Sequence, residues 1–247
     1  RAQGELTMFH KTSIVHIALF VVLALVSVIV ASPVSAGVGI WTSNGPQETT
    51  IYVLAIDPVV PTTIYAAPNS GGVYKSTNGG GSWRAVNTGL ANLNVHALAI
   101  DPTMPTTVYA ATSGGVYKST NGGGSWRAVN TGLTFTELST LVIDPLTPTT
   151  LYAGGFVEMG FPRPHDAENG GVYKSTNGGG SWSEIDAGIP RPNVYVLAID
   201  PVTPASLYAG TFDGVYKSTN GGMNWSKVFN SPDSYTWALV INPTAPT

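Results

Sequence analysis

The stretch Gly71–Leu90 reads GGVYKSTNGGGSWRAVNTGL, and Gly114–Leu133 repeats it without a single change. Related copies begin at Gly170 and Asp213. The tryptophan of the stretch recurs at positions 83, 126, 182 and 225, which are 43, 56 and 43 residues apart. Self-similarity at such a period is typical of proteins that are built by packing one structural unit against the next. The chain is therefore predicted to be a repeat protein.

Each repeat divides into four short apolar segments, which in the second repeat span residues 95–100, 107–111, 115–119 and 125–129. The first segment ends at Asp101-Pro102, since proline has no N–H for a strand ladder, and the Asp-Pro pair recurs at Asp57, Asp144 and Asp200, with Asn242 in a fifth copy. Four strands in about 43 residues is typical of a propeller blade, and no helical stripe is present. We expect an all-β fold, a β-propeller of four-stranded antiparallel blades.

The two ends of the repeat region each resemble one isolated strand. Residues 39–45 resemble the last strand of a blade, and residues 237–243 resemble the first strand of another. The sequence therefore predicts about four complete blades plus partial blades at both ends, with residues 37–247 forming a fragment of a larger propeller. A chain that stopped there would leave edge strands without partners.

The N-terminal region has the features of an export signal. A basic start, Met8–Lys11, precedes an apolar run, Ile14–Val30, and small residues that end at Ala36. This order is typical of a secretory signal peptide at residues 8–36, preceded by upstream translated residues 1–7. An uncleaved membrane anchor is the alternative. We expect a secreted or periplasmic protein that meets the membrane only transiently, through this segment.

The composition excludes several classes of function. The chain has 29 Gly, 18 Pro, no Cys, 10% charged residues and a net charge of −3. Without a Lys/Arg cluster, nucleic acid is not an expected partner. Without cysteine, there is no disulfide or thiolate metal site. His96 and His165, the histidines outside the predicted signal segment, have no spaced companion ligand. We expect no metal and no cofactor.

The turn Ser76–Trp83 is predicted to be a tight hairpin between the last two strands of a blade. Asparagine bonds its own backbone and tolerates left-handed dihedrals, glycine supplies positive φ, and tryptophan buries its ring beneath the turn. A ligand site is the alternative, but Ca²⁺ favours carboxylates over neutral Asn. We assign structural roles to four sets of residues: Ser76, Asn78, Gly80 and Trp83; Ser119, Asn121, Gly123 and Trp126; Ser175, Asn177, Gly179 and Trp182; and Ser218, Asn220, Gly222 and Trp225.

On these residues the chain resembles the Asp-box (bacterial neuraminidase repeat) propellers, with Asn at the Asp position in all four copies. That superfamily includes sialidases, xyloglucan-hydrolysing glycosidases, sortilin-type receptors and photosystem II assembly factors. The plain Val-Tyr-Lys-Ser-Thr-Asn-Gly-Gly-x-x-Trp copies are most similar to the sortilin and assembly-factor branch, which implies protein binding. The turn chemistry survives the Asp-to-Asn change.

Two exceptions to the repeat are candidate ligand sites on the face opposite the Asp-box turns. One is an insertion after the second strand of the third repeat, where loops favour function, although a tolerated surface insertion is the alternative. Its candidate residues are Phe156, Glu158, Phe161, Arg163, His165, Asp166 and Glu168.

The other exception is the variable residue five positions before each Asp-Pro or Asn-Pro. Aromatic side chains here could stack sugars or grip a peptide, and packing between blades is the alternative. The column contains Tyr52, His96, Ser139, Tyr195 and Trp237, of which the aromatic residues and His96 are the candidates.

These observations favour an exported, non-catalytic propeller that binds or scaffolds a protein or glycan partner. The alternative is a glycoside hydrolase, xyloglucanase-like or sialidase-like, whose carboxylates are partly in missing blades. The acidic residues expected on the candidate face show no spaced pair: Glu137, Glu158, Asp166, Glu168 and Asp233. The resemblance implies three arginines for a sialidase, whereas only Arg163 and Arg191 are expected there. We assign no catalytic residue.

Overall fold

The computed structural model describes residues 45–46, 50–156, 170–190, 192–231 and 235–244. Its strands form four antiparallel four-stranded sheets, which confirms the predicted all-β fold and the four complete blades. In each sheet, consecutive strands are neighbours. The first blade contains β1 (Ile51–Ile56), β2 (Ile64–Pro68), β3 (Tyr74–Ser76) and β4 (Arg84–Ala85); the second contains β5 (Val95–Ile100), β6 (Val108–Thr112), β7 (Gly115–Ser119) and β8 (Arg127–Ala128). The third contains β9 (Leu138–Ile143), β10 (Leu151–Phe156), β11 (Gly170–Ser175) and β12 (Ser183–Glu184); the fourth contains β13 (Val194–Ile199), β14 (Leu207–Thr211), β15 (Gly214–Ser218) and β16 (Ser226–Asn230).

The predicted strand boundaries hold for the inner three strands of a blade and fail for the outermost. In the second blade β5, β6 and β7 lie within one residue of their predicted spans, whereas β8 is only two residues long. The pairing still continues past β8, because Val129 N–H donates to the Val116 carbonyl at 2.9 Å. The length of the outermost strand differs between blades, since β4, β8 and β12 have two residues each and β16 has five.

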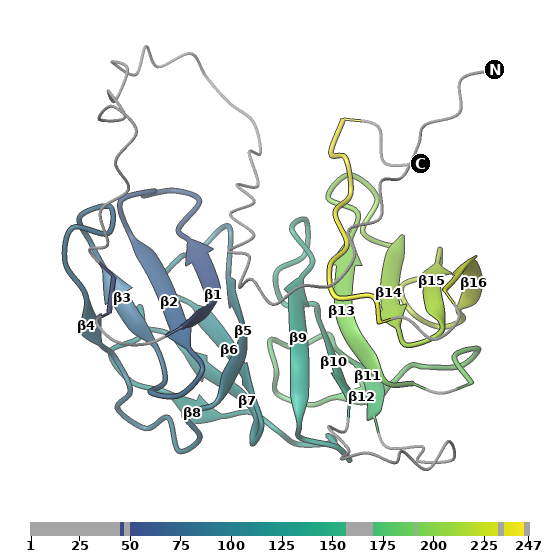
Figure 1. The fold of residues 1–247 in the computed structure, drawn as a ribbon, viewed down its shortest axis with the longest axis horizontal. Helices are drawn as coiled ribbons and strands as arrows, with labels where there is room; N and C mark the ends of the chain where they lie inside the picture. Colours follow the sequence, from purple (N-terminus) through teal and green to yellow (C-terminus); the bar gives the residue numbers. More distant parts are fainter. Residues whose placement is uncertain (1–44, 47–49, 157–169, 191, 232–234, 245–247) are drawn as a thin grey trace.

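The blades follow one another in an arc (Figure 1). The first strands β1, β5, β9 and β13 are neighbours in that order, while β4 and β16 lie at the outer edges of the view. The Asp-box turns share a face with the turns between the first two strands, since Gly79 N–H donates to the Thr62 carbonyl at 2.8 Å. The other two kinds of connection share the opposite face, where Gly72 N–H donates to the Leu93 carbonyl at 3.0 Å.

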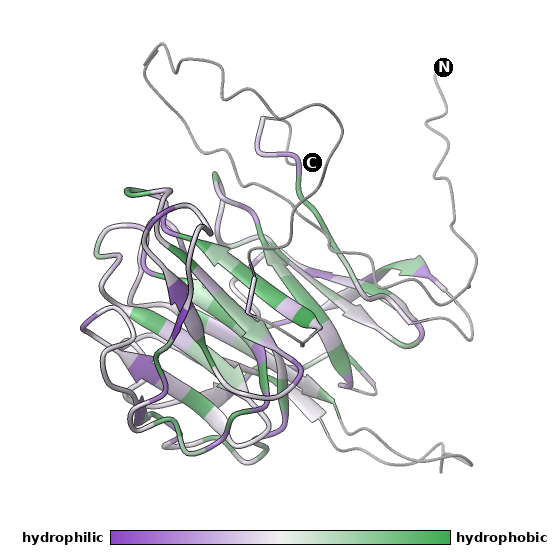
Figure 2. Ribbon diagram, turned by 60° about the vertical axis from the view of Figure 1, so that its left-hand side comes forward, coloured by the Kyte–Doolittle hydropathy of each residue, from purple (hydrophilic) through white to green (hydrophobic). Residues whose placement is uncertain are grey.

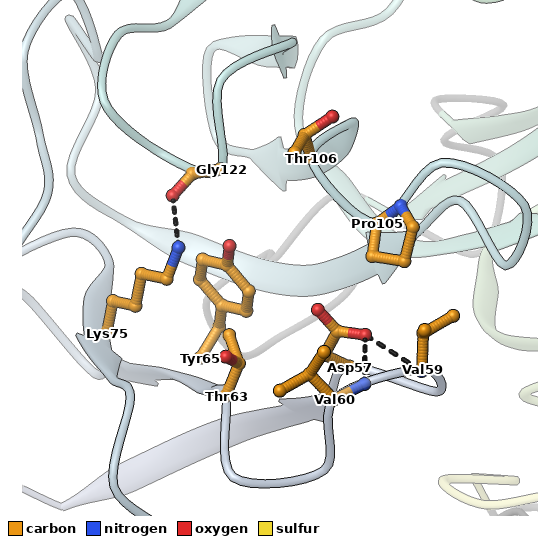
Figure 3. A pocket seen from close by; sticks show the side chains of 9 residues that line it. All are labelled: Asp57, Val59, Val60, Thr63, Tyr65, Lys75, Pro105, Thr106 and Gly122. Atoms are coloured by element: carbon orange, nitrogen blue, oxygen red, sulfur yellow. Dashed lines mark hydrogen bonds between the residues drawn. The ribbon is translucent and has the colours of Figure 1, made fainter.

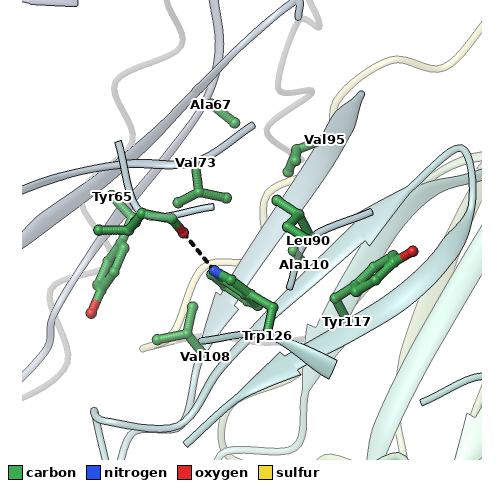
Figure 4. Close-up of a cluster of buried hydrophobic side chains, with 10 residues drawn as sticks. Tyr65, Ala67, Val73, Leu90, Val95, Val108, Ala110, Tyr117 and Trp126 are labelled. Carbon is green, nitrogen blue, oxygen red and sulfur yellow. Dashed lines mark hydrogen bonds between the residues drawn. The ribbon is translucent and has the colours of Figure 1, made fainter. Parts of the chain in front are cut away.

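The hydrophobic core lies between the blades. We call the interface between two consecutive blades a joint. In the first joint, Tyr65 and Val73 of the first blade pack with Val108 and Trp126 of the second (Figure 4). Comparable clusters fill the second and third joints, and apolar residues, green in Figure 2, accordingly concentrate on the strands. The second and third blades therefore bury both of their faces against neighbours, so that stability is a sum over blades and joints.

The repeated Asp-Pro pairs form the turns between the first two strands. Asp101 Oδ1 accepts hydrogen bonds from the N–H groups of Thr103 and Met104, at 2.8 and 2.9 Å. The same pattern holds at Asp57, Asp144 and Asp200. In the fifth copy, Asn242 Oδ1 accepts from Thr244 N–H at 3.0 Å. The side-chain oxygen is what these turns require, and Asn supplies it as well as Asp.

The C-terminal tail, residues 235–244, differs from the expected isolated strand. Thr236 N–H donates to the Thr211 carbonyl at 3.1 Å, and Thr236 lies against Gly210 as Val194 lies against Gly154. The tail thus occupies the place of a fifth first strand (yellow in Figure 1), yet it has no regular strand structure. A β-strand needs a ladder partner, and the four sheets of the described residues do not include the tail.

The predicted signal segment and most of residues 39–45 lie outside the described residues. Within the described part, no helix has the length and apolar character needed to cross a membrane.

Candidate functional site

The polar side chains of the Asp-box turns are engaged within the turn itself. Ser76 Oγ accepts from Gly80 N–H and donates to Asn78 Oδ1, both at 2.9 Å. Asn78 Oδ1 also accepts from Ser82 N–H at 2.9 Å, and its Nδ2 donates to Ser82 Oγ at 3.0 Å. The other three turns repeat the bond from serine to asparagine at the same length. These contacts close the hairpin. The serine hydroxyl and the asparagine side-chain amide, which a ligand would need, are already hydrogen-bonded within the turn.

The tryptophans of the turns differ in the hydrogen bond that the indole N–H makes. Trp126 Nε1 donates to the Val86 carbonyl of the preceding blade at 2.7 Å (Figure 4), and Trp182 and Trp225 donate likewise to Val129 and Ile185. Trp83 alone donates to its own turn, to the Gly80 carbonyl at 3.1 Å. The hydrogen bond of the indole N–H thus joins two blades in three of the four copies, and that each ring packs beneath its own turn stays a prediction.

A cavity of about 240 Å³ opens on the turn face, between the first two blades (Figure 3). Its charged groups already have partners: Asp57 Oδ1 accepts from Val59 and Val60 N–H, and Lys75 Nζ donates to the Gly122 carbonyl at 3.0 Å. Burial lowers the pKa of Lys75 and raises the pKa of Tyr65 to about 12. The lysine contact recurs at the next two joints, so this cavity is a feature of blade packing.

The variable residues five positions before each Asp-Pro lie at a β-bulge that recurs in every described blade. The register shifts between Ile51 and Val53, between Val95 and Ala97, and between Val194 and Val196, so that the ladder register passes over the residue in between. The residues skipped by the ladder are Tyr52, His96 and Tyr195, and Ser139 is skipped in the same way. A bulge redirects a side chain out of the alternating pattern. This backbone feature explains why the column tolerates such different residues.

An aromatic cluster lies at the fourth blade, on the face opposite the Asp-box turns. The ring centroids of Tyr195 and Phe156 are 4.4 Å apart, those of Tyr195 and Trp237 5.0 Å, and those of Tyr195 and Tyr235 5.1 Å. Phe212 completes the cluster, 4.9 Å from Tyr235. Tyr195 is 7% exposed, whereas Trp237 is 65% exposed. A buried ring thus supports a neighbouring ring that faces solvent.

The structure brings together three of the candidate residues, Phe156, Tyr195 and Trp237. Tyr52 and His96 are not members of the aromatic cluster: Tyr52 is 64% exposed on β1, and His96 Nε2 lies 2.9 Å from Ser113 Oγ. The insertion candidates beyond Phe156 lie outside the described residues: Glu158, Phe161, Arg163, His165, Asp166 and Glu168.

Sequence reasoning missed Phe212 and Tyr235. Tyr235 had a signal, because it precedes Trp237 by two residues, and side chains two apart on an extended chain share a face. Phe212 had none, since it lies in a turn that the repeat pattern did not single out.

Two carboxylates of the third blade, Glu184 on β12 and Asp186 just after it, interact electrostatically. Burial raises the pKa of Glu184 and of Asp186, and the charge of Asp186 raises the pKa of Glu184 further. Asp186 stands where the first two blades have Asn87 and Asn130, whose amides donate to backbone carbonyls. Among the described residues, no group of three or more His, Cys, Asp or Glu side chains could hold a metal ion.

No protein-family model and no curated protein matches the sequence, but solved β-propellers match the structure. An ancestral GH74 enzyme superposes with a TM-score of 0.63 and 32% identity, over 73% of this chain and 24% of that one. The GH74 xyloglucanase from Xanthomonas campestris gives 0.58 and 18%, over 77% and 31%. YCF48 from Cyanidioschyzon merolae gives 0.53 and 16%, over 75% and 58%.

The chain is therefore similar in structure to propellers of the Asp-box type. It spans 24% and 31% of the length of these two GH74 chains.

Proposed function

We propose that this chain is part of an exported, non-catalytic propeller that binds a glycan on its aromatic cluster. The observation that carries the proposal is the pairing of an exposed ring with a buried support, Trp237 at 65% and Tyr195 at 7% exposure. A flat ring offers a sugar an apolar face, and a supported ring loses little freedom on binding. The site follows the rule that loops added to a rigid scaffold carry function, since Phe156 is the first residue of the insertion, residues 156–169.

A glycan is favoured over a protein partner by the likeness to the ancestral GH74 enzyme, at 32% identity. The likeness to YCF48, at 16% identity, concerns the fold and supports no partner. The Xanthomonas campestris enzyme, which is of the same GH74 class, is a xyloglucanase. Xyloglucan oligosaccharides are therefore the first glycans to try.

Six of the eight described carboxylates favour binding over hydrolysis. Glycoside hydrolysis usually needs two carboxyl groups facing each other across the sugar. The four Asp-Pro carboxylates bond the backbone of their turns. Glu184 lies on β12 and Asp186 two residues after it, and neither is a member of the aromatic cluster. Hydrolysis is the second candidate, because the matched GH74 chains are enzymes.

Calorimetric titration with xyloglucan oligosaccharides tests the binding proposal. Trp237→Ala should weaken binding at least about tenfold, which corresponds to ~1.4 kcal/mol. Tyr52→Ala is the matched control, since it removes an equally exposed aromatic from the same column outside the aromatic cluster. Equal losses in both variants, or binding to neither wild type nor variants, would refute the proposal. Release of reducing ends from the same oligosaccharides would replace it with the hydrolase.

Export is tested separately by expression of the full chain. A secreted product whose N-terminus is Gly37 is the expected result, and retention of residues 8–36 in a membrane fraction would favour the anchor.

A further inference from the structure

The cavity in the joint between the first two blades leaves part of its polar lining without a partner. Tyr65 lines this cavity and is 1% exposed (Figure 3), and among the described residues no group hydrogen-bonds its hydroxyl. At the next joint, the equivalent Tyr109 hydroxyl donates to the Gly178 carbonyl at 3.3 Å. A buried tyrosine hydroxyl usually has a partner, because leaving the hydrogen bond unmade costs free energy. The Tyr65 hydroxyl is therefore an unused polar group of the cavity.

Asp57 supplies a second unused group. It is 7% exposed, and its Oδ1 accepts from the N–H groups of its turn, whereas its Oδ2 has no hydrogen-bond donor within the described part of the chain. In Figure 3 this second oxygen points away from the turn and into the cavity. At the next joint, Asp101 accepts an additional bond from Thr103 Oγ1 at 2.8 Å, but the first blade has Val59 in place of that threonine. The cavity thus contains a carboxylate oxygen that can accept from a ligand.

The other side of the cavity carries positive charge. Lys75 Nζ donates to the Gly122 carbonyl at 3.0 Å, and since an ammonium group has three donors, two remain for a ligand. Arg84 pairs with Lys75 in the ladder of β3 and β4, and paired residues share a face of the sheet, so its charge adds to that of the lysine. No ion pair joins Lys75 to Asp57, both of which the structure describes. Two opposite charges therefore line one cavity without meeting.

The space between these charges is small and has an apolar wall. Val59, Val60 and Pro105 line the cavity, whose volume is about 240 Å³. Pockets for drug-sized ligands measure roughly 300–1,000 Å³, so this cavity suits a smaller molecule. A sugar cannot stack on Tyr65, because the ring is buried in the joint and Lys75 Nζ lies 5.1 Å from its centroid. The complementary ligand carries a positive group, a negative group and an aliphatic part.

We propose that this cavity binds a small aliphatic α-amino acid as its zwitterion. The ammonium group of the ligand donates to Asp57 Oδ2, and its carboxylate accepts from Lys75 Nζ and from the Tyr65 hydroxyl. The aliphatic side chain lies against the wall of the two valines and the proline. A zwitterion bridges the two charges that the chain leaves apart, whereas an amine or a carboxylate alone would leave one of them unpaired. The cavity opens on the turn face, opposite the aromatic cluster, so this site does not depend on the proposed glycan function.

Nuclear magnetic resonance titration of the chain with L-valine tests the proposal. We expect saturable shifts of the amide signals of Val59, Val60 and Gly122, which line the cavity. Isobutylamine lacks the carboxylate and isovalerate lacks the ammonium group, so each should bind at least about tenfold more weakly. Equal affinity of either analogue would overturn the recognition of a zwitterion. If neither L-valine nor L-alanine caused saturable shifts, water alone would fill the cavity and the proposal would be overturned.

Asp57→Asn separates the charge of the site from the structure of the turn. Asparagine keeps the acceptor that the turn requires, as Asn242 does, but it loses the carboxylate charge that attracts the ligand. This variant should weaken the binding of L-valine at least about tenfold. Asp101→Asn is the matched control, because it makes the same change at the next joint, and the shifts at Gly122 should persist. An equal loss in both variants, or no loss in Asp57→Asn, would contradict the proposal.

Tyr65→Phe is the second variant, since it removes one hydroxyl and keeps the buried ring. It should weaken the binding of L-valine at least about threefold, as expected for one hydrogen bond. Tyr109→Phe is its control, because that hydroxyl already donates to the Gly178 carbonyl. Circular dichroism of all four variants checks that the fold is kept. Undiminished binding in Tyr65→Phe would remove the hydroxyl from the site, and undiminished binding in both Tyr65→Phe and Asp57→Asn would place the ligand elsewhere and overturn the proposal.

Discussion

Trp83 and Trp126 occupy the same position in two identical stretches of sequence, yet the structure treats them differently. Trp126 is 5% exposed and donates to the preceding blade, whereas Trp83 is only partly buried and donates to its own turn. The sequence around each ring is the same over Gly71–Leu90 and Gly114–Leu133. The difference therefore comes from the neighbour: the joint, and not the turn, determines where the ring lies.

We call the outward surfaces of the first and fourth described blades the two end faces. The same residue types are packed against a neighbouring blade in the interior joints and lie without one at the end faces of the described residues. At the start of the described arc, Leu54 is 40% exposed, whereas its counterparts Leu141 and Leu197 are 5% and 4% exposed. At the other end, Val228 shows the same contrast with Val86 and Val129. Substituting the two members of such a pair therefore measures what a joint contributes to the free energy of unfolding, since equivalent residues differ mainly in their neighbouring blade.

The largest contrast is expected at the tryptophans. Trp182→Ala should lower the free energy of unfolding by about 3–5 kcal/mol, because it leaves a cavity in a joint and an unpaired carbonyl at Val129. Trp83→Ala should cost less than about half as much, since its ring lies at an end face. Urea unfolding followed by circular dichroism measures both. Equal losses would show that the turn, and not the joint, is the unit of stability.

The second largest difference in stability is expected between a glycine at a joint and a glycine in an exposed hairpin. A Cβ on Gly132 would lie within van der Waals overlap of the Trp182 carbonyl oxygen, at a φ of +88°, whereas a Cβ on Gly79, at +68°, meets no atom within 4 Å. Gly132→Ala should therefore cost roughly 3 kcal/mol, and Gly79→Ala only the roughly 1–2 kcal/mol of a left-handed residue. Thermal unfolding of the two variants separates these costs. If Gly79→Ala proved the more damaging, backbone strain in the hairpin would outweigh blade contact.

A smaller difference in stability is expected between a lysine in an interior joint and a lysine at an end face. Lys118→Met removes a hydrogen bond to the Gly178 carbonyl, so a loss of about 1 kcal/mol is expected. Lys217→Met removes a lysine from an end face and should change stability by less than about 0.5 kcal/mol. Chemical denaturation resolves this difference if both variants are measured against wild type together. A larger effect at Lys217 would mean that the end face is covered in solution.

The smallest change in the free energy of unfolding is expected at Asp186, and this change depends on pH. Burial raises its pKa in the folded chain, so the folded state holds this proton more firmly than the unfolded state. Stability is then fully present below the ordinary aspartate pKa and declines as the pH rises through the folded value. Asp186→Asn should raise the free energy of unfolding at neutral pH by less than about 1 kcal/mol, with no gain in acid.

Asn87→Asp is the reciprocal control, because Asn87 Nδ2 donates to the Gly71 carbonyl at 2.8 Å and aspartate cannot. It should destabilise the chain at neutral pH. Parallel urea titrations in neutral and acidic buffer measure both variants. A gain for Asp186→Asn that persists in acid would show that side-chain ionisation is not its cause.

Much of the fold follows from local sequence. The Asp-Pro turns, the Asn-Gly hairpins and the positions of β5 to β7 depend on residues that act within their own segment. The candidate site was predictable in part: Phe156, Tyr195 and Trp237 stood out as exceptions to the repeat. Their mutual contact was not predictable, because it joins β10, β13 and the tail, which are far apart in the chain.

The sequence by itself determined the four-strand unit, its period and the chemistry of its turns, because these depend on side chains bonding their own backbone. Only the tertiary structure decided which tryptophan bridges two blades, which bulge residues meet in a cluster and which face lacks a neighbour. Those outcomes depend on what lies across a joint, and identical sequences cannot encode different neighbours.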